Sequence, residues 1–383
     1  MARWLVACIV LIAGCAQVPE KPCPVCPPAK PAAERAQYLQ VPFTALPGWD
    51  TTLLEPSLRA FMAGCARAPG PLIDACAVAS AVPSGDEAAA RRFFETTFVA
   101  YALAGTQGGD TGLITGYYEP ILHGARTRSA ANRFPIFGVP PDLVVVDLAT
   151  VAPEVRNLRL RGRVEGRRLV PYYSRAEIDA RGDAFNAPII GWAADPVELF
   201  FLQIQGSGQL ELDSGERIRL GYADQNGHPY RSLGRYLVER GELPLEQAGM
   251  EGIKAWAAGN PQKLQEALNV NASYVFFRES ADPRGPVGAL NVPLVPQYSL
   301  AIDRRYIPLG APVFLATTMP LSPEPLVRLA AAHDTGGAIR GVVRADFFWG
   351  TGQEAGRAAG RMKQNGKLWL LWPRGAALPP GAE

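Results

Sequence analysis

Two aspartates near the C-terminal end of the sequence have the surroundings of proton donors. Asp334 follows an apolar run, and Asp346 precedes three consecutive aromatic residues at positions 347–349. A carboxylate beside a large apolar surface is poorly solvated, and a second carboxylate nearby opposes its ionisation, so both effects raise its pKa. Because each aspartate ends a predicted strand, the pattern predicts two carboxyl groups at the ends of neighbouring strands.

Each aspartate also has a plainer interpretation. An aspartate before Thr-Gly-Gly commonly caps a turn, which leaves both roles of Asp334 open. An ordinary strand-end role explains Asp346 less well, because aromatic residues and many glycines surround it. Such glycines are typical of a groove in which a sugar or a substrate backbone comes close to the chain.

Further polar candidates lie in the sequence QIQGSGQL. The side chains of Gln203, Gln205 and Ser207, with Gly206 between them, donate and accept hydrogen bonds as sugar hydroxyls require. The alternative is the solvent face of a strand with a glycine bulge.

The motif GYYEP offers another candidate contact for a sugar. The rings of Tyr117 and Tyr118 are able to stack on a sugar, and Glu119 is able to bond it. Aromatic core residues and a turn explain the same motif.

The elements that would position these groups change in character at Gly112. Residues 36 to 110 have apolar side chains at helical spacing, and Ser84 with Glu87 predicts a capping box, so we expect a helical opening. Beyond Gly112, short β-rich runs alternate with glycine and proline.

The strongest β pattern covers residues 198–223. Phe200, Leu202 and Ile204 alternate with polar residues, and two more alternating runs follow, which predicts three antiparallel strands. Helices are predicted over residues 231–241 and 254–269. Strands are predicted over residues 273–279, 298–303, 311–317, 327–334 and 367–372. We therefore expect a mainly β fold with helical decoration, built as two barrels.

The first fifteen residues have the composition of a secretion signal. One positive charge precedes an apolar run of about ten residues, half of what a membrane-spanning helix needs, and small residues end at Cys15. The sequence IAGC resembles a bacterial lipobox, so we expect residues 1–14 to be a signal peptide and Cys15 to carry lipid. An ordinary signal peptide that ends in cysteine is the alternative.

Residues 15–37 are rich in proline, which favours an extended spacer. At about 3 Å per residue the spacer would carry a domain some 60 Å from a bilayer. Such a reach suits an enzyme that is tethered to a membrane and acts on the cell wall.

The remaining cysteines suggest one disulfide. Cys65 and Cys76 lie in two predicted helical stretches joined by a Pro/Gly turn, and export favours a bridge between them; free buried thiols are the alternative. Cys23 and Cys26 form a CxxC, but the surrounding prolines exclude the helix that a catalytic dithiol heads.

Composition and motifs argue against several classes of protein. The 38 Lys+Arg and 36 Asp+Glu residues nearly cancel and form no basic run, so we expect no nucleic-acid partner. The histidines at 123, 228 and 333 lack metal-ligand spacing. The sequence GTGQEAG at 350–356 fits a dinucleotide fingerprint only loosely, and no βαβ unit follows. We therefore expect neither a metal nor another cofactor.

Six sequence stretches occur in one order over much of the chain. They are GYYEP (116–120), QIQGSGQL (203–210), GHPYRSLGRYL (227–237), YVFFR (274–278), VPLVPQYSLAIDRRYIPLG (292–310) and DTGGAIRGVVRADFFWGTGQEAG (334–356). Together they resemble the membrane-bound lytic murein transglycosylase A family, and the lipobox and the spacer agree with that resemblance.

The resemblance implies a fold and a set of site residues. Residues 38–116 and 282–375 would form a double-psi β-barrel catalytic domain with N-terminal helices, and residues 117–281 an inserted β domain, with glycan in the groove between them. Three barrel aspartates would match Asp303, Asp334 and Asp346, the last being the single catalytic acid and base. Asp303 is then a supporting acid, although a surface ion pair with an adjacent arginine explains it equally.

The implied reaction cleaves the β-1,4 bond between N-acetylmuramic acid and N-acetylglucosamine in peptidoglycan without water. Neutral Asp346 would protonate the leaving oxygen, and its carboxylate would then take the proton of the C6 hydroxyl as a 1,6-anhydro ring closes. The pKa of Asp346 must lie well above its ordinary value for this, with aromatic burial and a charged Asp334 as sources.

Two rival functions remain. A hydrolase would use Asp334 or Glu119 to activate water, because ordinary glycosidases need two carboxyl groups. A non-catalytic lipoprotein would only bind the wall.

We expect the protein to be a monomer, lipid-anchored at the periplasmic face of the outer membrane, with Ala16 after the lipidated cysteine favouring that membrane. Peptidoglycan glycan strands are the expected partner. Membership of a complex that builds or degrades the wall stays open.

Overall fold

The computed structural model describes residues 34–106, 109–148, 150–151, 160–280 and 285–379. The expected signal peptide, the lipid-bearing Cys15 and the Cys23–Cys26 motif lie outside the described residues. Residues 34–383 form one compact unit. Within the described part, strands form sheets of eight, six and three strands. The helices described there are all too short or too polar to cross a bilayer.

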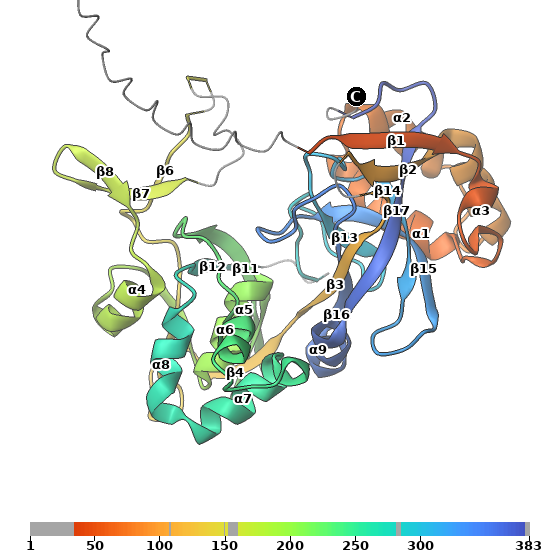
Figure 1. Ribbon diagram of the computed structural model, residues 1–383. Coiled ribbons are helices and arrows are strands. Elements are labelled where there is room, and N and C mark those ends of the chain that lie inside the picture. Colours follow the sequence, from red (N-terminus) through yellow and green to blue (C-terminus); the bar gives the residue numbers. More distant parts are fainter. Residues whose placement is uncertain (1–33, 107–108, 149, 152–159, 281–284, 380–383) are drawn as a thin grey trace, which may run out of the picture. The chain divides into compact units, whose positions relative to one another are not determined.

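The largest sheet joins the two ends of the described chain (Figure 1). Its strands, in sheet order, are β1 (Ala36–Val41), β2 (Phe98–Gly105), β17 (Lys363–Pro373), β14 (Pro312–Thr318), β15 (Pro325–Asp334), β13 (Ser299–Ile302), β16 (Ala345–Thr351) and β3 (Gly112–Glu119). Strand β17 also pairs with β3, from Lys363↔Thr115 to Gly366↔Gly112, so six strands close into a ring. This ring agrees with the expected double-psi β-barrel, and the mainly β fold class is confirmed.

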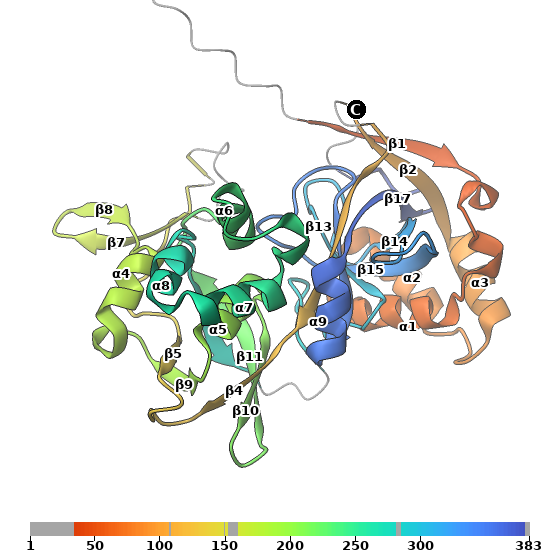
Figure 2. The ribbon, with the colours of Figure 1, turned by 60° about the horizontal axis from the view of Figure 1, so that its bottom comes forward.

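Buried apolar side chains explain why these strands form a barrel. All four residues of β13 are buried, and Phe314, Phe347 and Leu370 on three other strands are fully buried in the same core. Strands that are covered on both faces need nearly continuous apolar runs, which is what the sequence has at these positions. Helix α9 (Gly352–Arg361) packs beside β3 and β16 (Figure 2).

The expected all-helical opening is only partly correct. Three helices form there, namely α1 (Glu55–Gly64), α2 (Gly70–Ala79) and α3 (Glu87–Thr97), with short 3₁₀ turns η1 (Phe43–Ala45), η2 (Trp49–Thr51) and η3 (Cys65–Arg67). Strands β1 and β2 flank them and pair antiparallel, from Ala36↔Gly105 to Val41↔Ala100. Strand β2 also pairs with β17, more than 250 residues later in the chain, and such a distant partner leaves no local sequence signal.

The structure joins Cys65 and Cys76, the predicted pair, by a disulfide with a Cα–Cα distance of 5.6 Å. The predicted capping box of Ser84 and Glu87 is wrong. Asp86 caps α3, because its carboxylate accepts a hydrogen bond from the Ala89 N–H at 2.8 Å. The Glu87 carboxylate instead accepts from the Leu54 and Glu55 N–H groups at the start of α1.

The middle of the chain builds the second and third sheets. The six-stranded sheet has the order β12 (Val275–Glu279), β11 (Arg217–Gln225), β10 (Gly208–Leu212), β4 (Ile121–Ala125), β9 (Ile189–Ala193) and β5 (Phe134–Phe137). The third sheet has β6 (Val144–Val145), β7 (Arg161–Glu165) and β8 (Arg168–Pro171). The helices are α4 (Arg175–Arg181), α5 (Pro196–Gln205), α6 (Leu233–Glu239), α7 (Met250–Gly259) and α8 (Pro261–Asn269), with 3₁₀ turns η5 (Gly182–Ala184) and η6 (Leu245–Gln247).

One of the three strands predicted over residues 198–223 is a helix. Residues 200–204 belong to α5, whereas β10 and β11 form the expected antiparallel pair. The Asp195 carboxylate accepts hydrogen bonds from the Val197 and Glu198 N–H groups, and Pro196 occupies the first helical turn. Gly206 ends the helix with a φ of 79°, in the left-handed region that favours glycine. Helix α5 then packs against α7, which contacts α8 (Figure 2).

Candidate functional site

The two candidate acids lie in one row across four barrel strands. Ala301 on β13 is the register partner of both Asp334 on β15 and Asp346 on β16, and Asp346 is the partner of Thr115 on β3. Residues directly opposite one another on neighbouring strands project to the same face of a sheet. Strands lie about 4.8 Å apart, so the Cα atoms of the two aspartates are about 10 Å apart. A small alanine is all that separates them along the row.

This row lines a pocket of about 330 Å³, which we call the glycan pocket after the ligand that the sequence resemblance implies. Of the residues that the sequence singled out, it contains Tyr117, Gln203, Gln205, Gly206, Asp334 and Asp346. The structure therefore brings barrel acids and amides of the middle segment to one cavity. Asp303, Glu119 and Ser207 do not line it.

Asp346 is half-buried and has one side-chain hydrogen-bond donor. The Thr115 hydroxyl donates to its Oδ1 at 2.6 Å, and the Arg344 guanidinium donates to the same hydroxyl at 2.9 Å. Burial raises the pKa of Asp346, while the Thr115 bond and the charge of Arg344 partly oppose that rise. The result is a carboxyl group that keeps its proton to higher pH than an ordinary aspartate.

Apolar side chains account for this burial. Tyr117, Ala301, Ile339 and Phe348 form one cluster beside the acids, and the rings of Tyr117 and Phe348 lie 5.1 Å apart. Burial and the neighbouring acids raise the pKa of the Tyr117 hydroxyl well above its ordinary value, so Tyr117 stays neutral. Phe347, which the sequence also placed beside Asp346, instead lies in the main barrel core.

Asp334 is held by two backbone amides. Its Oδ1 accepts hydrogen bonds from the Ala289 N–H at 2.9 Å and the Thr335 N–H at 2.8 Å. Burial raises the pKa of Asp334 to about 6, and the charge of Asp346 adds to that rise although the amides oppose it. The sequence analysis expected the charge of Asp334 to act on Asp346, whereas the structure shows the effect on Asp334.

The Ala289 amide reaches Asp334 because the loop that carries it passes close to the backbone at the end of β15. A Cβ at Gly288 would lie 2.5 Å from the carbonyl oxygen of His333, so only glycine lets this loop pass the end of β15. The Leu290 N–H donates to that same carbonyl at 3.0 Å. The loop thereby fixes the position of the Asp334 carboxylate.

Asp303 is neither in the glycan pocket nor in a surface ion pair. Its side chain is 1% exposed, and its oxygens accept hydrogen bonds from the Arg305 guanidinium and from the Gly341 N–H at 3.0 Å. Burial alone would raise its pKa, but the bonds from Arg305 and the backbone lower that pKa overall. Asp303 therefore joins the end of β13 to the loop that precedes Asp346.

The glutamines belong to the end of α5 instead of to a strand. Gln205 accepts a hydrogen bond from the Tyr118 N–H at 3.1 Å, which ties the helix to β3. Gln203 is 5% exposed, and its Oε1 has no hydrogen-bond partner among the described residues. Such a buried acceptor is costly unless a ligand supplies a donor.

Glu119 does not have the access that a sugar contact needs. Its side chain is fully buried and accepts hydrogen bonds from Gln209 at 2.8 Å, from Thr351 at 2.7 Å and from Arg219. These bonds connect β3 with β10, with β11 and with the end of β16. Glu119 therefore links strands to one another, which corrects the sequence interpretation that it bonds a sugar.

Several residues that line the glycan pocket were not among the candidates predicted from the sequence. Tyr222, Tyr230 and Arg175 line the glycan pocket together with Arg344. Thr115 lies two residues before Tyr117, and Arg344 lies two residues before Asp346. Their closeness in sequence to these two candidate residues was a usable signal. The sequence carried no signal for Arg175, because only folding of the chain brings its side chain to the pocket. No group of three acidic, histidine or cysteine side chains in the described part is placed to hold a metal ion.

Comparisons with known proteins agree with this geometry. A family model described as the MltA specific insert domain matches residues 113–278, and one described as the 3D domain matches residues 298–372. The chain is 33% identical over 282 residues to the membrane-bound lytic murein transglycosylase A of Escherichia coli K12, covering 71% of this chain and 68% of that protein.

Solved structures are similar over most of the chain. MltA from Neisseria gonorrhoeae is 45% identical with a TM-score of 0.79, covering 90% of this chain and 94% of that one. E. coli MltA with bound chitohexaose is 27% identical with a TM-score of 0.69, covering 88% and 94%.

Proposed function

The chain belongs to the membrane-bound lytic murein transglycosylase A family, and on that premise we propose that it cleaves peptidoglycan glycan strands without water. The bond cut is the β-1,4 link between N-acetylmuramic acid and N-acetylglucosamine, and the product ends in a 1,6-anhydro ring. The bound chitohexaose of the E. coli relative supports a glycan as the ligand of the glycan pocket. Cell-wall turnover is the corresponding role.

The observation that carries the proposal is the environment of Asp346. Its carboxyl group lines the glycan pocket, is kept protonated to higher pH by burial, and accepts one hydrogen bond from Thr115. As general acid, it gives its proton to the glycosidic oxygen as the C1–O bond breaks. As general base, the carboxylate then takes the proton of the muramic acid's C6 hydroxyl, whose oxygen bonds to C1. Atoms and charge balance with no other reactant.

The other two acids have supporting roles in this proposal. Asp334, with a pKa of about 6, adds a second ionisable group in the same pocket and is fixed by backbone amides. Asp303 positions the loop before Asp346 through its bonds to Arg305 and Gly341. Gln203, Gln205, Gly206 and Tyr117 contact the glycan, with Ser207 beyond the pocket lining.

We assign the two large sheets to the two domains that the resemblance implied. Residues 38–116 and 282–375 form the catalytic barrel domain, and residues 117–281 form the inserted domain. The sheet pairings support two units, because β4, β5 and β9–β12 pair with one another and not with barrel strands, although Tyr117 and Glu119 at the first boundary still pair with β16.

The protein is membrane-associated in this proposal, through lipid on Cys15, at the periplasmic face of the outer membrane. The support is that the relatives are known as membrane-bound transglycosylases, together with the IAGC sequence of this chain. The proline-rich spacer would let the enzyme reach the wall.

Mass spectrometry of digested murein tests the chemistry. Wild-type protein is expected to release anhydro-muropeptides, and Asp346→Asn to lower the rate at least about a hundredfold, because an acid and base contributes that much or more. Asp334→Asn is the matched comparison: it keeps an oxygen for the two amides and removes only the charge, so we expect a loss of less than about tenfold.

Two outcomes would overturn the proposal. Reducing ends in place of anhydro ends, lost in the Asp334→Asn variant, would identify a hydrolase that uses Asp334 to activate water. Equal glycan release by wild type, Asp346→Asn and a buffer control would identify a wall-binding protein without activity.

A further inference from the structure

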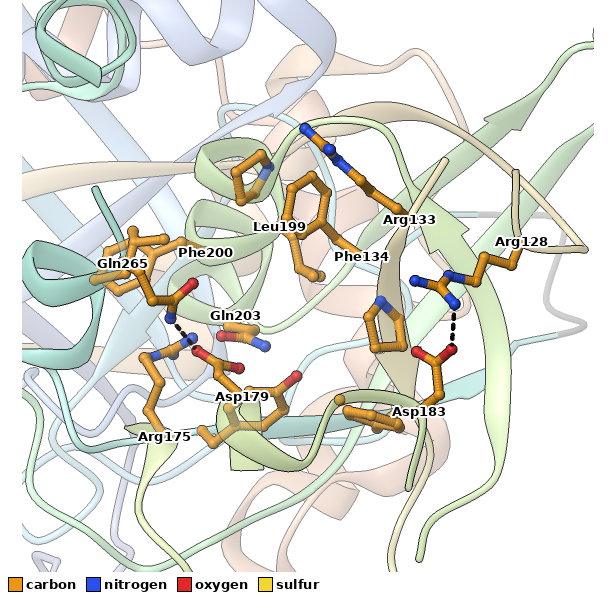
Figure 3. A pocket seen from close by; sticks show the side chains of 16 residues that line it. Arg128, Arg133, Phe134, Arg175, Asp179, Asp183, Leu199, Phe200, Gln203 and Gln265 are labelled. Atoms are coloured by element: carbon orange, nitrogen blue, oxygen red, sulfur yellow. Dashed lines mark hydrogen bonds and ion pairs between the residues drawn. The ribbon is translucent and has the colours of Figure 1, made fainter. Parts of the chain in front are cut away.

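Figure 3 shows a second pocket, of about 240 Å³. Helices α4, α5 and α8 and strand β5 supply its lining, and neither candidate acid reaches it. Arg175 and Gln203 line both pockets, so these two side chains form a shared wall. We call this cavity the side pocket.

The shared wall presents one polar atom that lacks a partner, on Gln203, beside the buried cation of Arg175. Gln203 is 5% exposed, and its Oε1 accepts no hydrogen bond within the described structure. Arg175 is 4% exposed; its guanidinium donates to the carbonyls of Asn271 at 2.9 Å and Ser273 at 2.7 Å and takes part in no ion pair of the described residues. A buried acceptor without a donor destabilises the folded chain unless a ligand supplies the donor. An amide group, which has both N–H and C=O, would satisfy the acceptor and the cation together.

Aromatic rings hold this wall in place. The Arg175 guanidinium lies 4.8 Å from the ring centroid of Phe200 and 5.0 Å from that of Tyr274. Cation–π contacts of this kind fix the plane of an arginine. The site is therefore preorganised, and a ligand need not order it.

The rest of the side pocket carries charges of both signs. Arg128 and Asp183 form an ion pair at 2.8 Å, and Asp179 accepts a hydrogen bond from Gln265 at 3.0 Å, as the dashed lines of Figure 3 show. Arg133 is exposed and contacts the ring of Phe134 without an ion pair in the described part of the chain. Burial raises the pKa of Asp179.

We propose that the side pocket binds the peptide branch of peptidoglycan. A backbone amide of the branch bonds Gln203 and Arg175 at the shared wall, and a branch group that carries an ammonium and a carboxylate lies against Asp179 and Arg133. Sugar hydroxyls carry no charge and would offer those two side chains no charge pairing. This inference rests on the proposed function, because a glycan in the neighbouring pocket is what brings a peptide branch to the wall.

Binding measurements with two probes test the inference. Isothermal titration calorimetry compares chitohexaose, which has no peptide, with a murein tetrasaccharide that keeps its peptide branches. The protein is the full chain with Asp346→Asn, so that the probe is not consumed. Arg133→Gln is expected to weaken binding of the peptide-bearing probe about tenfold, as the loss of one charge-assisted contact does, and to leave chitohexaose binding unchanged. Arg67→Gln, an exposed arginine elsewhere, is the matched control and should change neither.

The results separate the alternatives. Equal weakening of both probes by Arg133→Gln would make the side pocket a sugar site, and no weakening of either would leave it without a ligand role; each overturns the inference. The proposed function fails separately, because the cleavage assay on wild-type protein does not depend on the side pocket. Asp179→Asn provides a second variant, with the same selective loss expected.

Discussion

An aspartate ordinarily loses its proton far below neutral pH, and Asp346 and Asp334 depart from that behaviour for the same physical reason. Both carboxyl groups lie beside the cluster of Tyr117, Ala301 and Ile339, where water is scarce, and burial is the largest influence on each pKa. They differ in what holds them, since a hydroxyl donates to Asp346 and two amides donate to Asp334. The single hydroxyl leaves Asp346 the freer to exchange a proton with a sugar.

The Thr115 hydroxyl should set the pH range of activity. Its hydrogen bond stabilises the carboxylate and so lowers the pKa of Asp346; Thr115→Val removes the bond and lets that pKa rise further. In the proposed mechanism the acid works in its neutral form, so activity should be lost as pH rises through this pKa. We therefore expect the falling limb of the kcat–pH profile to move to higher pH in Thr115→Val.

Thr115→Ser is the control for that experiment. It keeps the hydroxyl, and its profile should match the wild type. A valine variant with an unmoved falling limb would show that Asp346 is not the group whose ionisation limits the rate.

Residue types alone located part of this site. Asp334 and Asp346 were predicted because an acid next to an apolar run is unusual, and Gln203 because amides suit sugars. Glu119 looked equally suitable, but its burial against Arg219 and Gln209 depends on strands far away in the chain. The charge effect on Asp334 was also out of reach, because the burial of the two carboxyl groups and their proximity depend on the fold.

At the scale of elements, α5 shows where local patterns mislead. Leu202 and Ile204 alternate with Gln203 and Gln205, which fits a strand, but so few residues cannot separate the strand period from the helix period. The residues at the two ends of the segment indicate a helix, because Asp195 and Pro196 are typical of a helix start and Gly206 is typical of a helix end. A helix here is what places Gln203 between two pockets.

The helices of residues 55–97 were predicted, but the strands around them were not. Strand β2 exists because β1 and β17 flank it, and its half-buried pattern carries no clear period. The helical region itself is stabilised by the disulfide, whose two cysteines are separated by 11 residues.

Replacing both cysteines by serine is expected to lower the free energy of unfolding by about 3 kcal/mol, because the bridge restricts the unfolded chain over a short loop. Chemical denaturation measures the loss. Reductant should destabilise the wild type by a similar amount and leave the double variant unchanged; equal sensitivity of both proteins to reductant would contradict this role.

At the scale of the whole molecule, the barrel is closed by two strands that are about 250 residues apart in the chain. The β17–β3 pairing joins residues 363–366 to residues 112–115, and the middle segment leaves and re-enters between them. Composition and periodicity predicted a mainly β protein but not this closure, because ring closure depends on long-range register. The resemblance to a known family supplied the topology that local patterns did not.

The proposed lipid anchor concerns the whole molecule, and it leads to our last prediction. Two or three acyl chains hold a protein on a membrane, whereas a protein without them has no comparable attachment. Cys15→Ser should therefore move the protein from the membrane fraction to the soluble periplasmic fraction, as cell fractionation and immunoblotting would show. Cys23→Ser, a matched change in the same spacer, should stay with the membrane. Because the glycan pocket is built from residues 116–346, purified Cys15→Ser protein should still digest isolated murein. Retention of Cys15→Ser in the membrane fraction would show that something other than lipid on this cysteine holds the enzyme there.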